Sequence, residues 1–227
     1  MTQNNIQPPA PAKKTILLVD DHPILCEGLK QYLEQDEKLL VCGRAGDVAA
    51  ALRLVNELKP DLIVLDLGLP GRDGLELIKD IRARNNICRI LVFSLFDEGL
   101  YAERALRAGA QGYLMKSESP QKLRDAIHGI LKGEMVTGNV VIQRALQRTV
   151  TGQTAAPASP LALLTDRQLE IFRLIGAGKS RNEIAAQLHL SVKTFEVHRA
   201  NIRQKMGFKC ARELLMSAAQ YVQEIKN

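Results

Sequence analysis

The chain has 227 residues, which is long for one small domain and suits two domains that each bury a core of their own. No stretch reaches the ~18 apolar residues of a membrane-spanning helix, so the composition predicts a soluble, cytoplasmic protein without a membrane partner. The formal charge is +6, and residues 1–133 hold 18 Lys and Arg against 18 Asp and Glu, whereas residues 134–227 hold 13 against 7. The basic second half predicts a polyanionic partner. The alternative is a basic surface that serves only solubility.

The first residues and the cysteines predict little chemistry. Residues 1–14 are polar and rich in proline, which predicts a disordered tail. Cys26, Cys42, Cys88 and Cys210 are far apart in the sequence and have no metal-ligand spacing. We therefore expect small, buried, reduced side chains. Redox sensing by one of them is the alternative reading.

Between residues 15 and 133, short apolar runs alternate with helical patterns. Strands are expected at residues 16–19, 39–42, 62–65, 90–93 and 112–115, and helices at 24–33, 48–58, 75–84, 100–108 and 120–131. This strict alternation predicts an α/β fold, a doubly wound five-stranded parallel sheet with helices on both faces. Gly109 after the fourth helix and Ser119-Pro120 before the fifth are typical helix stop and start signals.

The remainder of the chain predicts a connection and then a small all-α domain. Residues 134–160 are expected to form a short helix near 140–147 and a flexible linker from 149, which is uncharged and rich in small residues and proline. Residues 161–227 are helical throughout. Thr165 to Gln168 and Ser180 to Glu183 fit capping boxes, and further helices are expected at 192–206 and 211–225. Short helices joined by tight turns in a basic domain indicate a helix-turn-helix.

Five polar side chains follow strands of the predicted sheet. Asp20 and Asp21 end the first strand, Asp66 the third, Ser94 the fourth and Lys116 the fifth. Because ligands bind at the carboxyl ends of parallel strands, these groups should converge on one pocket. Clustered carboxylates repel one another unless they share a cation, most simply Mg²⁺. The set suits phosphoryl transfer to Asp66, with Lys116 and Ser94 binding the phosphoryl oxygens.

The first half of the chain resembles the receiver domains of two-component response regulators. The residues that carry this resemblance, in the family's order and spacing, are Asp20, Asp21, Asp66, Pro70, Asp73, Gly74, Ser94, Tyr113 and Lys116. The resemblance implies that Asp66 is the phosphoacceptor. It also implies that Asp21, the Asp66 carboxylate and the Gly68 backbone carbonyl coordinate Mg²⁺, and that Asp20 assists.

The same resemblance assigns a switch. Ser94 would be the hydroxyl that turns toward the phosphoryl group, and Tyr113 the aromatic side chain whose rotamer follows it. Ser94 stands where threonine is commoner, and it keeps the hydroxyl. Leu95 is bulky, so we expect it to restrict water and alter the lifetime of the acyl phosphate.

The helix expected at residues 192–206 has two different faces. Val192, Phe195, Ile202 and Met206 form an apolar face that should pack on the other helices. The opposite face carries Lys193, Glu196, Val197, Arg199, Ala200 and Arg203. A basic face of short side chains can enter the major groove of double-stranded DNA, where Val197 would contact a thymine methyl group. The alternative is one tolerated exposed valine.

This second half resembles the LuxR-type DNA-binding domain. Residues 164–171, 178–185 and 191–207 follow its pattern, with Phe195 where valine is usual and Asp166 where glutamate is often found. The resemblance implies a recognition helix at 192–205 and a dimer face at 211–222. The candidate DNA-binding residues are Lys179, Ser180, Lys193, Thr194, Glu196, Val197, His198, Arg199, Ala200, Asn201, Arg203 and Lys205.

A receiver followed by a LuxR-type domain is the architecture of NarL/FixJ response regulators. The combined resemblance implies a transcription factor, not an enzyme, that a sensor histidine kinase phosphorylates at Asp66 and that forms a homodimer on DNA when phosphorylated. One alternative is a phosphorylation-independent regulator that uses the receiver as a dimer module. Another is a Mg²⁺-dependent phosphatase, which would be expected to carry a general-acid Asp two residues after the nucleophile, where Gly68 stands.

Overall fold

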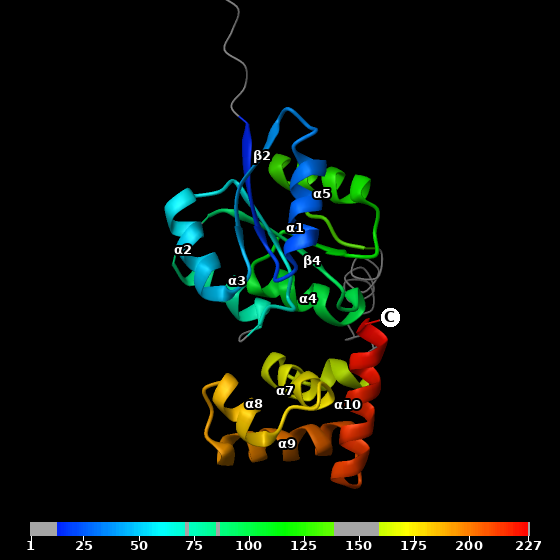
Figure 1. The fold of residues 1–227 in the computed structure, drawn as a ribbon. Helices are drawn as coiled ribbons and strands as arrows, with labels where there is room; N and C mark the ends of the chain where they lie inside the picture. The colour runs from blue at the N-terminus through cyan, green and yellow to red at the C-terminus, as the bar shows by residue number, and fades with distance from the viewer. Residues whose placement is uncertain (1–12, 71–72, 85–86, 139–158, 227) are drawn as a thin grey trace, which may run out of the picture.

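The computed structural model describes residues 13–70, 73–84, 87–138 and 159–226 and shows an α/β domain followed by a helical one (Figure 1). The predicted tail lies outside these residues up to residue 12, and Lys14, which was expected in that tail, begins the first strand. The helix predicted near 140–147 and the linker from 149 to 158 also lie outside the described residues.

The first domain contains the predicted five-stranded parallel sheet. Its strands are β1 (Lys14–Val19), β2 (Leu39–Ala45), β3 (Leu62–Leu65), β4 (Arg89–Ser94) and β5 (Gly112–Met115), in the order β2-β1-β3-β4-β5. The strand β2 is three residues longer than predicted, because a shift in register against β1 lets pairing continue through the less apolar residues Gly43 and Arg44.

Helices cover both faces of this sheet (Figure 1). α1 (Pro23–Leu33) and α5 (Pro120–Lys132) pack on one face, and α2 (Val48–Leu58), α3 (Gly74–Ala83) and α4 (Glu98–Ala108) on the other. Neighbouring strand residues enter opposite cores, so Ile16 and Leu62 face α1 and α5, whereas Leu17 and Ile63 face α2 to α4. Burial on both faces explains why the strands are continuously apolar. The doubly wound prediction is confirmed.

The second domain consists of η1 (Pro160–Leu163), α7 (Asp166–Gly176), α8 (Arg181–Gln187), α9 (Val192–Met206) and α10 (Ala211–Lys226). Both predicted capping boxes form, at Thr165 for α7 and at Ser180 for α8. α10 packs closely against α7 at Gly176. A Cβ atom added there would lie only 2.1 Å from the carbonyl oxygen of Ala218. No helix within the described residues is long and apolar enough to span a bilayer.

Two expectations about burial need correction. On α9, Phe195 and Ile202 are buried as predicted, but Val192 is 39% exposed. It occupies the first turn of the helix, beside the capping residue Ser191, and projects beyond the packed face. Of the four cysteines expected to be buried, Cys42 is half-buried and Cys210 is exposed. Cys210 lies in the short connection between α9 and α10.

Candidate functional site

The predicted pocket forms at the carboxyl edge of the sheet. Asp20 and Asp66 follow β1 and β3, and the backbone N–H of Asp66 donates to the carbonyl of Val19 at 2.8 Å, which keeps the two strand ends level. Both carboxyl side chains are nearly buried, with Asp20 8% and Asp66 6% exposed. Burial without a partner would cost each carboxylate several kcal/mol, so these groups require positive charge or hydrogen-bond donors nearby.

Asp66 has donors on both carboxylate oxygens. The hydroxyl of Ser94, at the end of β4, donates to Oδ1 at 2.6 Å, and the backbone N–H of Gly68 donates to the same oxygen at 3.1 Å. The ammonium of Lys116 lies 2.7 Å from Oδ2. The three side chains predicted to act in phosphoryl transfer therefore meet at one carboxylate.

Lys116 also forms an ion pair with a second acid, Asp20. Its Nζ is 2.6 Å from Oδ2 of Asp20, and its own side chain is 7% exposed. Burial alone would lower the pKa of Lys116, but the charges and hydrogen bonds of Asp66 and Asp20 outweigh it and raise the pKa above its usual value. Lys116 consequently stays charged, and its ammonium bridges the two acids.

Four side chains could hold a metal ion beside this bridge. Ligand atoms of Asp20, Asp21, His22 and Asp66 all lie within 4.8 Å of one another. Nδ1 of His22 is 2.9 Å from Asp20 and 3.0 Å from Asp21. The three carboxylates suit a hard divalent cation such as Mg²⁺. His22 was not predicted, although its place directly after two acids was a visible signal.

The second switch candidate, Tyr113, is a buried residue of β5. Tyr113 is 1% exposed, and its hydroxyl donates to the backbone carbonyl of Phe96 at 2.8 Å. The Phe96 ring packs on Tyr101, with the ring centroids 4.8 Å apart. The backbone N–H of Tyr113 also donates to the carbonyl of Val136, so the chain after α5 pairs with the edge of β5. Phe96 and Val136 carried no sequence signal, since neither belongs to a predicted motif.

The candidate DNA-binding residues divide by exposure. Those that are exposed are Lys179, Ser180, Lys193, Thr194, Val197, Ala200, Asn201 and Lys205, and those that are half-buried are Glu196, His198, Arg199 and Arg203. Val197, at 54% exposed, lies on the outer face of α9 as predicted.

Some of these side chains also have partners within the domain. The ammonium of Lys205 contacts the carbonyl of Leu163 at 3.0 Å and Gln168 at 2.8 Å, and Arg203 donates to the carbonyl of Lys209. Arg199 pairs with Glu196 at 2.6 Å. The end of α9 therefore serves domain packing as well, and Lys193, Val197, Ala200 and Asn201 form the freest part of its outer face.

An acid pocket with a lysine and a hydroxyl on a doubly wound sheet, joined to a helix-turn-helix domain, defines a DNA-binding regulator controlled through its receiver. Comparison with known proteins agrees. Residues 16–128 match the family model of the response regulator receiver domain, and residues 162–218 match that of bacterial regulatory proteins of the luxR family.

Individual relatives span both domains. The chain is 35% identical over 195 residues to the nitrate/nitrite response regulator protein NarL of Escherichia coli K12, covering 86% of this chain and 90% of NarL. It is 33% identical over 204 residues to the oxygen regulatory protein NreC of Staphylococcus aureus RF122, covering 88% and 94%. A solved structure of RcsB from Salmonella enterica serovar Typhimurium, bound to promoter P1flhDC with the phosphomimetic BeF3⁻, has a TM-score of 0.71 at 26% identity and covers 92% of this chain and 99% of that one. The chain belongs to the response regulators that join a receiver to a LuxR-type DNA-binding domain.

Proposed function

We propose that this protein is a cytoplasmic transcriptional regulator in which Asp66 accepts a phosphoryl group from a sensor histidine kinase. The observation that carries the proposal is the pair of short contacts on the Asp66 carboxylate, from Ser94 at 2.6 Å and Lys116 at 2.7 Å. Two convergent donors beside two further acids suit a carboxylate that must accept additional negative charge.

The residues of the pocket have separate tasks in this reaction. A carboxylate oxygen of Asp66 attacks phosphorus in line, and the bond to the donor nitrogen of the kinase histidine breaks. Lys116 and Ser94 then donate to the phosphoryl oxygens. Mg²⁺, held by Asp20, Asp21, the Asp66 carboxylate and the carbonyl of Gly68, would neutralise the charge of the incoming group.

The second domain supplies the output. The exposed side chains of Lys193, Ala200 and Asn201 on α9 suit the major groove, with Val197 as an apolar contact for a thymine methyl group. The exposed apolar side chains of Leu215 and Met216 on α10 suit pairing of two such domains. RcsB, which resembles this chain over both domains, binds promoter DNA in the presence of BeF3⁻. This supports a phosphorylation-dependent homodimer on paired half-sites.

The test is oligomeric mass and DNA binding of the full-length protein with Mg²⁺, with and without acetyl phosphate or BeF3⁻. We expect dimerisation and tighter binding to a specific site in the wild type, and neither in Asp66→Asn. Asp125→Asn is the matched control, because Asp125 is an exposed acid on α5 that contacts only Gln121 among the described polar groups. Full phosphate-dependent binding by Asp66→Asn would refute the assignment. A constitutive wild-type dimer would favour the receiver as a simple dimer module.

A further inference from the structure

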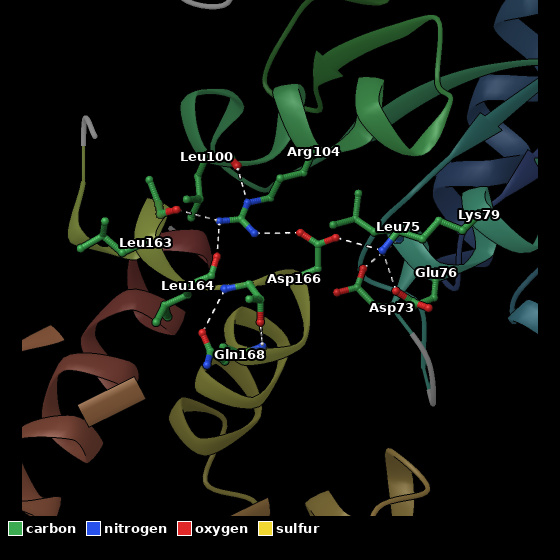
Figure 2. Close-up of polar contacts among 12 residues, drawn as sticks. Asp73, Leu75, Glu76, Lys79, Leu100, Arg104, Leu163, Leu164, Asp166 and Gln168 are labelled. Atoms are coloured by element: carbon green, nitrogen blue, oxygen red, sulfur yellow. Dashed lines mark hydrogen bonds and ion pairs between the residues drawn. The ribbon is translucent and has the colours of Figure 1, made fainter. Parts of the chain in front are cut away.

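The two domains dock through an ionic cluster around Asp166, the first residue of α7 (Figure 2). Arg104 of α4 contacts its carboxylate at 2.8 Å, and Lys79 of α3 contacts it at 3.0 Å. Arg104 also donates to the carbonyl of Leu164 at 2.7 Å and to that of Ala162 at 3.3 Å. One arginine of the receiver thus holds both the start of α7 and the segment before it.

A second contact reaches further into the receiver. The guanidinium of Arg173, on α7, lies over the ring of Phe96 with 4.5 Å between its Cζ atom and the ring centroid. Burial by itself would lower the pKa of Arg173, but the nearby Asp73 has the largest opposing effect and the pKa is raised. Arg173 therefore remains a cation over an aromatic ring of the receiver.

The aromatic contact of Arg173 lies on a segment that leaves the pocket. Phe96 is two residues after Ser94, and its carbonyl accepts a hydrogen bond from the hydroxyl of Tyr113. Asp73, whose charge acts on Arg173, precedes α3. The start of α3 lies close to the end of β3, because a Cβ atom on Gly74 would lie 2.9 Å from the carbonyl oxygen of Asp66 and 2.6 Å from Cα of Leu67. Arg173 therefore contacts the segment after β4 through Phe96 and acts electrostatically on the acid that precedes α3.

The docked arrangement does not cover the DNA-binding face. α7 lies between the receiver and α9, and α9 runs along the far side of its domain (Figure 1). Lys193, Val197, Ala200 and Asn201 are all exposed. Leu215 and Met216, at 50% and 61%, are exposed as well. Docking in this geometry cannot inhibit the protein by hiding α9.

We propose that the docked arrangement is the DNA-binding form of the protein, and that phosphorylation of Asp66 strengthens docking through the positioning residue Arg173. This inference rests on the proposed function. A phosphoryl group shifts an equilibrium toward the state that binds it better. In the docked state Ser94 and Lys116 already point at the Asp66 oxygens, and Arg173 lies over the ring of Phe96. Undocking removes this cover from Phe96 and frees the residues that directly follow Ser94, so the pocket would have to be ordered again to bind the phosphoryl oxygens.

Docking also benefits DNA binding. A domain that is free on a linker must lose its orientational freedom when it binds a half-site. Two domains fixed on paired receivers, each with α9 outward, have lost much of that freedom beforehand, which raises their effective concentration at paired half-sites. The coupling is reciprocal: phosphoryl binding strengthens docking by the same factor by which docking strengthens phosphoryl binding, so a change that weakens docking lowers the phosphoryl affinity by at most that factor.

The experiment measures that reciprocity in the full-length protein with Mg²⁺. The probe is BeF3⁻, with half-saturation followed by ¹⁹F nuclear magnetic resonance and the radius of gyration by small-angle X-ray scattering. We expect Arg173→Ala to need about 5- to 10-fold more BeF3⁻ than the wild type. Arg104→Ala, which changes the receiver side of the interface, should also need more BeF3⁻ for half-saturation than the wild type. Arg173→Lys should recover only part of the loss, because an ammonium lacks the planar group that stacks on Phe96. Arg53→Ala, an exposed arginine on α2 that pairs with Glu57, is the control.

Four results would overturn the inference. Tighter BeF3⁻ binding by Arg173→Ala, or expansion of the wild type on adding BeF3⁻, would mean that docking opposes phosphorylation. If both Arg173→Ala and Arg104→Ala bound BeF3⁻ as tightly as the wild type, and the wild type still responded to BeF3⁻, docking would not be coupled to phosphoryl binding. The proposed function would then stand without this inference. A wild type that binds no BeF3⁻ would overturn both proposals.

Discussion

Replacing Lys116 by methionine should lower the free energy of unfolding, because two buried carboxylates lose the cation between them. Lys116 lies within 2.7 Å of both Asp20 and Asp66, and all three side chains are 7% exposed. Methionine keeps the length and most of the volume of lysine but removes the ammonium. Removing one partner of a buried ion pair costs roughly 3–5 kcal/mol, because the remaining charge is left uncompensated.

Two processes should reduce this loss in Lys116→Met. The facing carboxylates repel each other, and protonation of one of them removes this repulsion. The destabilisation should therefore be larger at neutral pH than at acid pH. Mg²⁺ should also replace part of the missing charge, so the free energy of unfolding of the variant should rise with Mg²⁺ more steeply than that of the wild type.

The assay is urea unfolding at pH 7.5 and pH 5, with Mg²⁺ and with a chelator. The control is Lys122→Met, since Lys122 pairs with Glu118 at 2.7 Å but its side chain is 61% exposed. A pair of this kind is worth at most about 1 kcal/mol. A Lys116→Met variant as stable as Lys122→Met in chelator at pH 7.5 would refute the argument that the lysine balances the two acids.

Three further outcomes are expected. Burial alone would raise the pKa of Asp61, but its hydrogen bonds, led by that from Lys14, outweigh burial and lower the pKa. The stabilisation that the Asp61 carboxylate contributes is therefore present above about pH 4 and is lost as the pH falls through the lowered pKa. Asp61→Asn should therefore cost about 1 kcal/mol at pH 7 and less at pH 3 in urea unfolding, and an equal loss at both would contradict this. Gly176→Ala should destabilise the second domain by about 1–3 kcal/mol, seen in its thermal unfolding, because the added methyl group would meet the carbonyl of Ala218. Val197→Ser should weaken specific DNA binding by about 1–3 kcal/mol while stability changes by less than about 0.5 kcal/mol, and unchanged binding would show that the valine is only tolerated.

Most of the pocket was predictable because its geometry follows from chain direction. Parallel strands bring their carboxyl ends to one edge, so Asp66, Ser94 and Lys116 needed no further information to be placed together. Capping boxes at Thr165 and Ser180 were equally local, since each depends on side chains three residues apart. These features are decided by neighbouring residues or by a single topological rule.

Docking was not predictable for the opposite reason. Asp166 reads as a helix-capping acid, and Lys79 and Arg104 read as solvated charges on amphipathic helices, so none indicates its partner. Their contacts join residues 62 and 87 positions apart. Val136, which pairs with the edge of β5, is one bridge residue with no strand periodicity around it. Sequence patterns identify which side chains are chemically suited to pair, and only the relative position of the domains decides which of them do.

Buried apolar side chains of both domains belong to one cluster, and the ionic contacts beside it are the part of the interface that can be adjusted by one phosphoryl group. The Lys79 pair is partly exposed and contributes at most about 1 kcal/mol, and Arg173 on Phe96 contributes about 1–2 kcal/mol. Because both domains are part of one chain, docking is intramolecular and does not need a large contact energy. Its equilibrium then lies within the roughly 1–3 kcal/mol that an allosteric ligand can supply. Arg104 is shielded, Lys79 is partly exposed and Arg173 lies over the Phe96 ring. Contacts of this strength suit a docking equilibrium that phosphorylation can shift.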